Sequence, residues 1–289
     1  MAVRVVSDSA CDLPPETCDA LGIEIVPLTI RFGNDEFIDR KELSTDAFWK
    51  KLETSPVLPE TAAPSVGAFE ETFRNLHDSG ADGIVCINLS ASLSATMQSA
   101  QVAAKAVDGL CPIEIIDSAS ASMGIGILAL HAARRAAEGA DVPTIAREVT
   151  DRRERQSLYA TLDTLEYLKR GGRIGGAQAL LGSMLSIKPI VTVVNGAVEQ
   201  AGKVRTRSKA LHFILDRVPA HNVESVCVLH SGAGDIDEFM AALQPKVPGA
   251  EIVVGKIGPV VGVHVGPGAM GITWIERASG GDPEARTLG

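Results

Sequence analysis

A unit that occurs three times in the first half of the chain restricts the fold more than any other feature of the sequence. Each unit has a short apolar run, a turn rich in Ser and Asp, and a helix-like segment. The apolar runs cover residues 3–6, 84–89 and 113–116. Alternating strands and helices indicate a mainly parallel sheet with helices on both faces. In such sheets ligands bind beyond the carboxyl ends of the strands, where all three turns are expected to lie.

The second unit, residues 84–100, is the best candidate for a binding site. Its apolar run predicts a buried strand, and a helix is expected to begin near Ser94 or Ala95 after a Ser-rich turn. Ser is a good N-cap, and the first turn of a helix attracts anions through its free N–H groups and its dipole. The turn therefore predicts a seat for a phosphate or a carboxylate. The alternative is that its serines only cap the helix and contact water.

Length and composition indicate a globular protein with two α/β domains. Of the 289 residues, 45% are hydrophobic and 22% are charged, as in proteins with a large core. We expect an N-terminal domain over 1–155 with a mainly parallel sheet, a C-terminal domain over 156–278 with a mixed or antiparallel sheet, and a disordered tail over 279–289. Asn195-Gly196 is a strong signal for a hairpin turn in the second domain.

Charge and cysteine content narrow the classes of function. A net charge of −9 disfavours general nucleic-acid binding, which needs a basic surface. We expect neither a signal peptide nor stable insertion in a membrane, because the longest apolar stretch is too short to span a bilayer. The five cysteines include no CxxC pair, which indicates reduced thiols, no cysteine-based metal site and a cytoplasmic location.

Several segments have more than one interpretation. The proline-containing stretch 54–64 and the Gly-rich stretch 258–271, which includes His264, are predicted to be loops, and 23–30 is predicted to be one strand. Gly124 and Gly126 follow a strand and open a helix, so a nucleotide-dependent oxidoreductase or transferase is an alternative function. A third alternative is a structural or regulatory module. Arg205 and Arg207 form either a solvated pair or a bidentate anion site.

Short segments spread over residues 3–275 together resemble the DegV family of bacterial fatty-acid-binding proteins. Each is weak alone, but their order along the chain is specific. The segments are Ser7-Asp8-Ser9-Ala10-Cys11-Asp12-Leu13, Thr61-Ala62-Ala63-Pro64-Ser65, Leu93-Ser94-Ala95-Thr96-Met97-Gln98-Ser99-Ala100, Asp117-Ser118, Leu165 through Gly171-Gly172-Arg173-Ile174, Lys188-Pro189, Lys203-Val204-Arg205-Thr206-Arg207, and Gly258-Pro259 through His264 to Gly268. The chain departs from the family where Ala95, Met97 and Gly175 replace the usual Gly, Tyr and Ser.

The resemblance implies that one long-chain fatty acid is buried between the two domains. It assigns direct contacts with the carboxylate to Thr61 and Ser94, and supporting roles to Ser92 and His264. It also implies an ATP-dependent fatty acid kinase partner that phosphorylates the carboxylate, in phospholipid metabolism. The partner-facing residues that it implies are Arg173, Arg205 and Arg207. The chain itself is then a carrier, with no catalytic residues, no metal and no cofactor.

Overall fold

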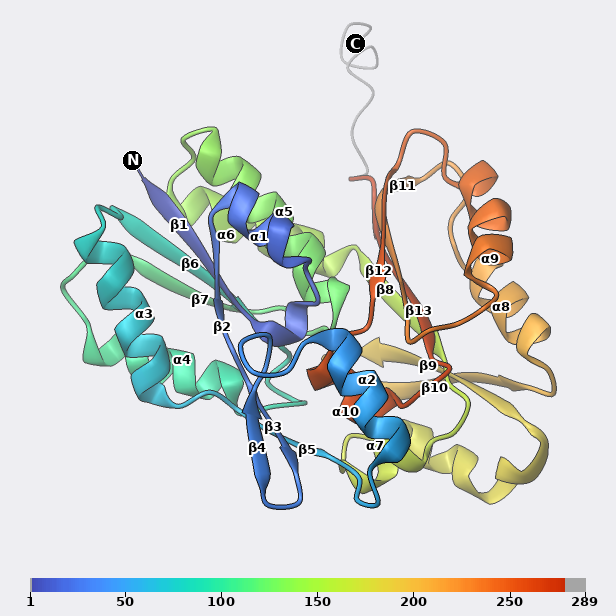
Figure 1. Ribbon diagram of the computed structural model, residues 1–289. Helices are drawn as coiled ribbons and strands as arrows, with labels where there is room; N and C mark the ends of the chain where they lie inside the picture. The colour runs from blue at the N-terminus through green and yellow to red at the C-terminus, as the bar shows by residue number, and fades with distance from the viewer. Residues whose placement is uncertain (1, 279–289) are drawn as a thin grey trace, which may run out of the picture.

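The computed structural model describes residues 2–278, and the side chains of all of these except 181–186. Two sheets stand side by side, each with its own helices, and a small third sheet lies below the gap between their ribbons in the view of Figure 1. The predicted tail, 279–289, lies outside the described residues. No helix among residues 2–278 is long and apolar enough to cross a membrane.

The first sheet is parallel throughout, as the repeated units predict. Its strands lie in the order β2-β1-β6-β7. They cover β1 Val3–Asp8, β2 Ile23–Val26, β6 Gly83–Asn88 and β7 Ile113–Asp117. The helices of this half are α1 Pro15–Leu21, α3 Val66–Asp78, α4 Thr96–Ala106, α5 Met123–Ala137 and α6 Val142–Glu154. The pair α3 and α4 covers one face of the sheet, and α5 and α6 cover the other (Figure 1).

Both faces of the first sheet are apolar because every second side chain of a strand points to the same face. In β6, Ile84 and Cys86 pack into the core formed with α3 and α4. Their neighbours Val85 and Ile87 belong to the opposite core, which is formed with α5 and α6. This second core continues into the other half of the molecule, where it includes residues such as Leu229.

The second sheet is mixed, again as predicted. Its strands lie in the order β10-β9-β8-β13-β11-β12, and only β11 and β12 run parallel. They cover β8 Gln156–Thr161, β9 Lys188–Val194, β10 Ala197–Val204, β11 Val223–His230, β12 Glu251–Lys256 and β13 Met270–Glu276. Asn195 and Gly196 have φ angles of 50° and 79°, so the predicted hairpin turn joins β9 to β10. Helices α8 Arg207–Leu215 and α9 Ile236–Leu243 cover the outer face, where Trp274 is buried.

A small sheet and several short helices complete the fold. The small antiparallel sheet has the order β4-β3-β5, with β3 Thr29–Phe32, β4 Asp35–Ile38 and β5 Glu60–Ala62. The remaining helices are α2 Thr45–Thr54, α7 Glu166–Arg170, α10 Pro259–Val265 and the 3₁₀ segments η1 Ser9–Cys11, η2 Gly175–Ser186 and η3 Gln244–Lys246.

Three local predictions are wrong. The stretch 54–64 is not all loop, because Thr61 pairs with Ile30 and forms strand β5. The stretch 258–271 is not all loop either, because Gly258 caps α10 and Pro259 occupies its first turn. The single strand expected over 23–30 is divided into β2 and β3, and Pro27, which lacks a backbone N–H, lies between them.

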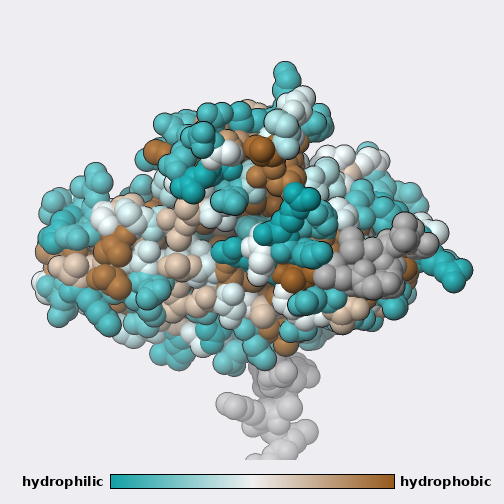
Figure 2. Space-filling model, turned by 90° about the horizontal axis from the view of Figure 1, so that it is seen from below, coloured by the Kyte–Doolittle hydropathy of each residue, from teal (hydrophilic) through white to brown (hydrophobic). Residues whose placement is uncertain are grey.

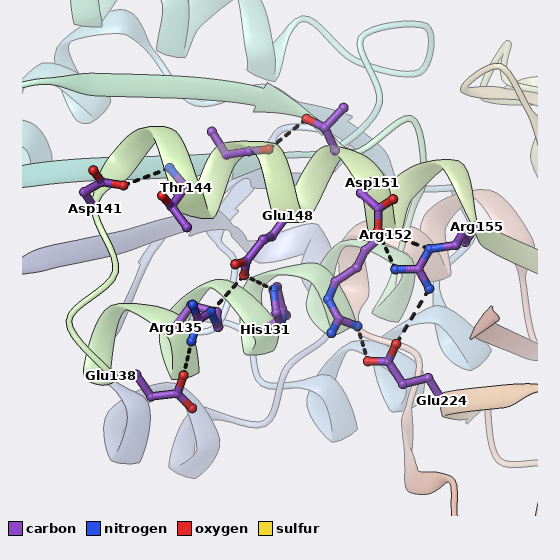
Figure 3. A network of polar contacts seen from close by, with 12 residues as sticks. His131, Arg135, Glu138, Asp141, Thr144, Glu148, Asp151, Arg152, Arg155 and Glu224 are labelled. Carbon is purple, nitrogen blue, oxygen red and sulfur yellow. Dashed lines mark hydrogen bonds and ion pairs between the residues drawn. The ribbon is translucent and has the colours of Figure 1, made fainter. Parts of the chain in front are cut away.

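Ion pairs connect α5 and α6 to the edge of the second sheet. Arg152 of α6 and Arg155, which caps the end of that helix, both reach Glu224 at the start of β11, as Figure 3 shows. Arg134 of α5 donates to both carboxylate oxygens of Glu251 in β12, at 2.5 and 2.6 Å. These pairs are partly exposed, so each contributes at most about 1 kcal/mol to stability. Together they fix the two halves on the side where α5 and α6 meet β11 and β12.

A buried carboxylate fixes α10 against the first half of the chain. Asp12 accepts hydrogen bonds from the Ser122 hydroxyl at 2.5 Å and from the backbone N–H of Gly258 at 3.1 Å. Burial raises the pKa of Asp12 to about 7, against the opposing effects of Ser122 and Arg40. Since Ser122 begins α5 and Gly258 begins α10, this one side chain aligns two helix ends that both contribute to the site described below.

Candidate functional site

Three adjoining cavities form the candidate site. The central one, here called the polar pocket, receives polar groups from Thr61, Ser94, Arg173 and His264 and is otherwise lined by apolar side chains. It encloses about 520 Å³, part of it open to solvent. These four residues come from β5, the turn before α4, the segment after α7, and α10. The fold therefore brings together side chains that lie up to 203 positions apart in the sequence.

Thr61 and His264 are joined by a hydrogen bond of 3.1 Å between Oγ1 and Nε2. The other ring nitrogen of His264, Nδ1, is buried and has no hydrogen-bond partner among the described residues. A buried unpaired N–H is rarer than a buried unpaired acceptor, which favours the tautomer with the proton on Nε2. In that tautomer the histidine donates to Thr61, and the Thr61 hydroxyl proton is free to point into the pocket.

The neighbourhood of His264 keeps its ring neutral. Burial lowers the pKa of His264 to about 4, and the positive charge of Arg173 acts in the same direction. The ring packs directly over Gly171, where any Cβ would collide with it. Gly171, which in the sequence indicates a helix break together with Gly172, thus also provides space for this ring.

Ser94 presents its hydroxyl from the turn that precedes α4. Its Oγ accepts the backbone N–H of Thr96 at 3.3 Å and lies 2.9 Å from the Thr96 hydroxyl. Thr96 is fully buried, whereas Ser94 is only partly buried and lines the pocket. If Thr96 donates to Ser94, the Ser94 proton is available to a ligand. The N-cap position itself is Ala95, one residue later than the first of the two predicted starts.

Arg173 supplies positive charge to the polar pocket. Its Nε donates to the carbonyl of Leu93 at 3.0 Å, and one terminal nitrogen donates to the carbonyl of Gly171 at 2.6 Å. The other terminal nitrogen makes no hydrogen bond, and no carboxylate in residues 2–278 pairs with this guanidinium. Two hydroxyl donors and an uncompensated guanidinium suit a carboxylate, since a buried carboxylate is costly unless it accepts hydrogen bonds.

The second cavity is almost entirely apolar and opens from the polar pocket. It has a volume of about 670 Å³ including open solvent and is lined from both halves of the chain, by Leu93, Ala121 and Met123 on one side and by Leu162, Val191 and Ile272 on the other. The two cavities share lining residues such as Leu168 and Val261. The hydroxyls of Thr192 and Thr273 donate to backbone carbonyls, so they are not available to a ligand. This cavity suits a long hydrocarbon chain.

The third cavity, here called the mouth, connects the polar pocket with the surface. Its wall includes Pro56, Leu58, Tyr167 and Arg170, and it shares Thr61, Arg173 and His264 with the polar pocket. It encloses about 1060 Å³ including open solvent. Figure 2 shows the side of the molecule where β3, β4, β5 and α7 lie, and this surface is mainly hydrophilic with small apolar areas. A group held in the polar pocket is therefore within reach of the mouth.

The structure separates the other predicted site residues from this pocket. Ser92 is exposed, and its hydroxyl lies beside Gly196 of the β9–β10 turn and not in the polar pocket. Arg205 is exposed and lines neither the pocket nor the mouth. Arg207 is held by both carboxylate oxygens of Asp235 and by the carbonyl of Gly268, so most of its donors are already occupied.

The two glycines of the nucleotide alternative lie inside α5 and not in a phosphate-binding loop. A side chain at Gly124 would collide with Ser120, and one at Gly126 would collide with the Cys11 carbonyl and Met123. These positions are therefore glycine because the helix packs closely there. No group of His, Cys, Asp or Glu side chains in the described part of the chain is arranged to hold a metal.

The position of Arg173 in the polar pocket was not predicted from the sequence, which assigned this residue to a partner surface. The signal that could have found it is local, because Arg173 lies two residues after Gly171, which makes room for His264. The apolar lining from β8, β9 and β13 was not predicted residue by residue, since it depends on which face of each strand turns inward.

Comparisons with known proteins agree with this architecture. The family model "Uncharacterised protein, DegV family" matches residues 2–277. A DegV domain-containing protein of Streptomyces coelicolor is 39% identical over 282 residues, which are 95% of this chain and 99% of the relative. A solved DegV family protein from Thermus thermophilus, reported for its fatty-acid binding, has a TM-score of 0.89 and 32% identity and covers 96% of this chain and 100% of its own. The solved DegV protein of Bacillus subtilis, a fatty-acid-binding protein, has a TM-score of 0.87 and 30% identity over 96% of this chain and 100% of its own.

The protonation of His264 provides a test of the site geometry. We expect its ring to titrate near pH 4, well below the usual value near 6.5, because burial and Arg173 disfavour the charged form. The unfolded chain takes up this proton near pH 6.5, so the free energy of unfolding should fall as the pH drops from about 6.5 to about 4. Ring ¹⁵N chemical shifts, assigned with a His264→Gln variant, measure the pKa directly. A pKa near 6.5 would mean that the ring is solvated and that the described pocket is wrong.

Proposed function

Since this chain belongs to the DegV family, we propose that it binds one long-chain fatty acid, with the carboxylate in the polar pocket and the hydrocarbon chain in the apolar cavity. The observation that carries this proposal is that the two cavities adjoin and share lining residues, while, of the two, only the polar pocket is lined by Thr61, Ser94, Arg173 and His264. The cavities lie between the two domains proposed for residues 1–155 and 156–278. DegV proteins of T. thermophilus and B. subtilis bind fatty acids, which supports the same ligand class here.

The energetics favour this ligand. Removing a CH₂ group from water contributes about 0.8 kcal/mol, so a buried chain of about 16 carbons supplies on the order of 10 kcal/mol before ordering costs. Burying the carboxylate without hydrogen-bond partners would cancel much of this favourable free energy. Thr61, Ser94 and Arg173 offset that loss when His264 donates to Thr61 and Thr96 donates to Ser94, because both hydroxyl protons and one Arg173 nitrogen then remain for the ligand.

We further propose that the protein presents the bound carboxylate to an ATP-dependent fatty acid kinase in the cytoplasm, for use in phospholipid metabolism. The position of Thr61, Arg173 and His264 between the polar pocket and the mouth supports this step. A carboxylate oxygen held there could attack the γ-phosphorus of ATP brought by a partner, with ADP leaving and an acyl phosphate forming. In this scheme the chain holds and exposes the acid, and the partner supplies the catalysis. The acid is its ligand, and no cofactor is needed.

The hydroxyl groups of the polar pocket provide the test of fatty-acid binding. We expect Thr61→Val and Ser94→Ala each to weaken the binding of hexadecanoic acid by about 1–3 kcal/mol, or roughly 5- to 150-fold in Kd, because each removes a donor to a charged group. Isothermal titration calorimetry on delipidated protein measures both changes. Thr61→Ser, which keeps the hydroxyl, should bind nearly as well as the wild type.

Unchanged affinity in the Thr61→Val, Ser94→Ala double variant would place the carboxylate elsewhere. A Ser99→Ala variant on α4 controls for general effects on that helix, because Ser99 does not line the pocket.

Arg205 provides the test of the partner step. We expect Arg205→Ala to leave the Kd for hexadecanoic acid within about twofold of wild type and to slow acyl-phosphate formation by the cognate kinase about fivefold, since an exposed guanidinium suits a phosphate-bearing partner. Arg74→Ala on α3, which removes another surface arginine, should change neither measurement. Arg207→Ala is less informative, because it also breaks the contact with Asp235. Equal phosphorylation of Arg205→Ala and wild type would remove Arg205 from the partner surface.

A further inference from the structure

The apolar cavity is bordered on a second side, away from the mouth, by polar side chains. It adjoins a polar cleft, here called the far cleft, which includes Ser120, Arg153, Glu154, Gln156, Ser157 and Asn195 in its wall. The far cleft encloses about 1290 Å³ including open solvent. It shares Leu158, Thr192 and Val193 with the apolar cavity, but it shares no lining residue with the polar pocket. The apolar cavity therefore lies between two polar regions.

The boundary between the apolar cavity and the far cleft, here called the neck, lies at strands β8 and β9, because Leu158 and Thr192 line both. The Thr192 hydroxyl donates to the carbonyl of Leu158 at 2.7 Å, which ties the two strands together at this point. The Gln156 side-chain amide, in the wall of the cleft, donates to the carbonyl of Gly124 at 2.8 Å, and Gly124 lines the cavity. Ordered polar contacts thus frame the neck.

The far cleft contains hydrogen-bonding groups that the protein leaves partly unused. Arg153, at the end of α6, donates one terminal nitrogen to the carbonyl of Asp117 at 3.0 Å. Its remaining N–H groups make no hydrogen bond, and no carboxylate in the described part of the chain forms an ion pair with it. Glu154 is exposed in the same cleft and can accept a hydrogen bond. The cleft therefore offers both a charged donor and an acceptor to an oxygen atom.

We propose that the far cleft receives an oxygen function at the far end of the bound acyl chain, so that this protein accepts ω-oxygenated long-chain acids, namely ω-hydroxy acids and α,ω-dicarboxylic acids. The proposal rests on the fatty-acid binding proposed above and extends it to a second polar subsite. An apolar cavity closed at its far end would leave an ω-hydroxyl buried without a partner. Such a group weakens binding by roughly 5- to 150-fold. The far cleft avoids this cost because the oxygen can reach Arg153, Glu154 or solvent.

The first part of the test needs only the wild-type protein. Delipidated protein is titrated calorimetrically with hexadecanoic acid, ω-hydroxyhexadecanoic acid and hexadecanedioic acid, and then with shorter and longer members of each series. At the best chain length we expect both ω-oxygenated acids to bind within about threefold of the plain acid. If both ω-oxygenated acids bind about tenfold or more weakly than the plain acid at every chain length, the proposal is overturned. If the plain acids themselves fail to bind, the proposed function fails, and this inference falls with it.

The second part of the test addresses Arg153. We expect Arg153→Gln to raise the Kd for hexadecanedioic acid about tenfold and the Kd for the plain acid less than about twofold. The Kd for the ω-hydroxy acid should rise by less than that for the dicarboxylic acid. Near-wild-type binding of the plain acid also verifies that the variant is folded. Arg147→Gln is the matched control, because Arg147 lies on the same helix, is exposed and does not line the cleft. An equal change for all three acids, or none for any, would remove Arg153 from the subsite.

Discussion

The hydrogen bond between Thr61 and His264 is the contact on which the site depends. It joins a three-residue strand near the start of the chain to a short helix near its end. The strand is held by its pairing with β3, and the helix by Asp12, which accepts the N–H of Gly258 at the helix start. Because burial keeps His264 neutral, its ring can hold the Thr61 oxygen without adding a charge that would compete with Arg173.

The same arrangement explains why a carboxylate can be bound in a mostly apolar interior. Thr61 and Ser94 can each accept a hydrogen bond from a neighbouring side chain and donate to a ligand, and Arg173 has a terminal nitrogen without a hydrogen-bond partner among the described residues. The ion pairs of Arg134 and Arg152 with the second sheet lie at other residues and line neither the polar pocket nor the apolar cavity. Stability at the junction of the two halves is thus separated from the groups that contact a ligand.

The layered architecture was predictable from the sequence, whereas the construction of the pocket was only partly so. Runs such as 84–89 are long and apolar enough to identify a buried strand, and Asn195-Gly196 identifies a hairpin, because both signals are local. Strand β5 was missed because it exists only through its pairing with β3. Helix α10 was missed because its glycine and β-branched residues have low helix propensity, and its position depends on Asp12, 246 residues earlier.

The positions of individual site residues were also predicted only in part. Ser94 and His264 were placed near the ligand through the resemblance to the DegV family, and the structure brings both to one pocket. Arg173 was expected at a partner surface, and the structure places it in the wall of both the polar pocket and the mouth, where it donates to the Leu93 carbonyl, 80 residues away. The most direct test of the proposed binding mode is a crystal structure of the protein with hexadecanoic acid. We expect one carboxylate oxygen to lie within hydrogen-bonding distance of Thr61 Oγ1 and Ser94 Oγ, and the hydrocarbon chain to lie in the apolar cavity. An acid bound in the reverse direction, or outside these cavities, would contradict this binding mode.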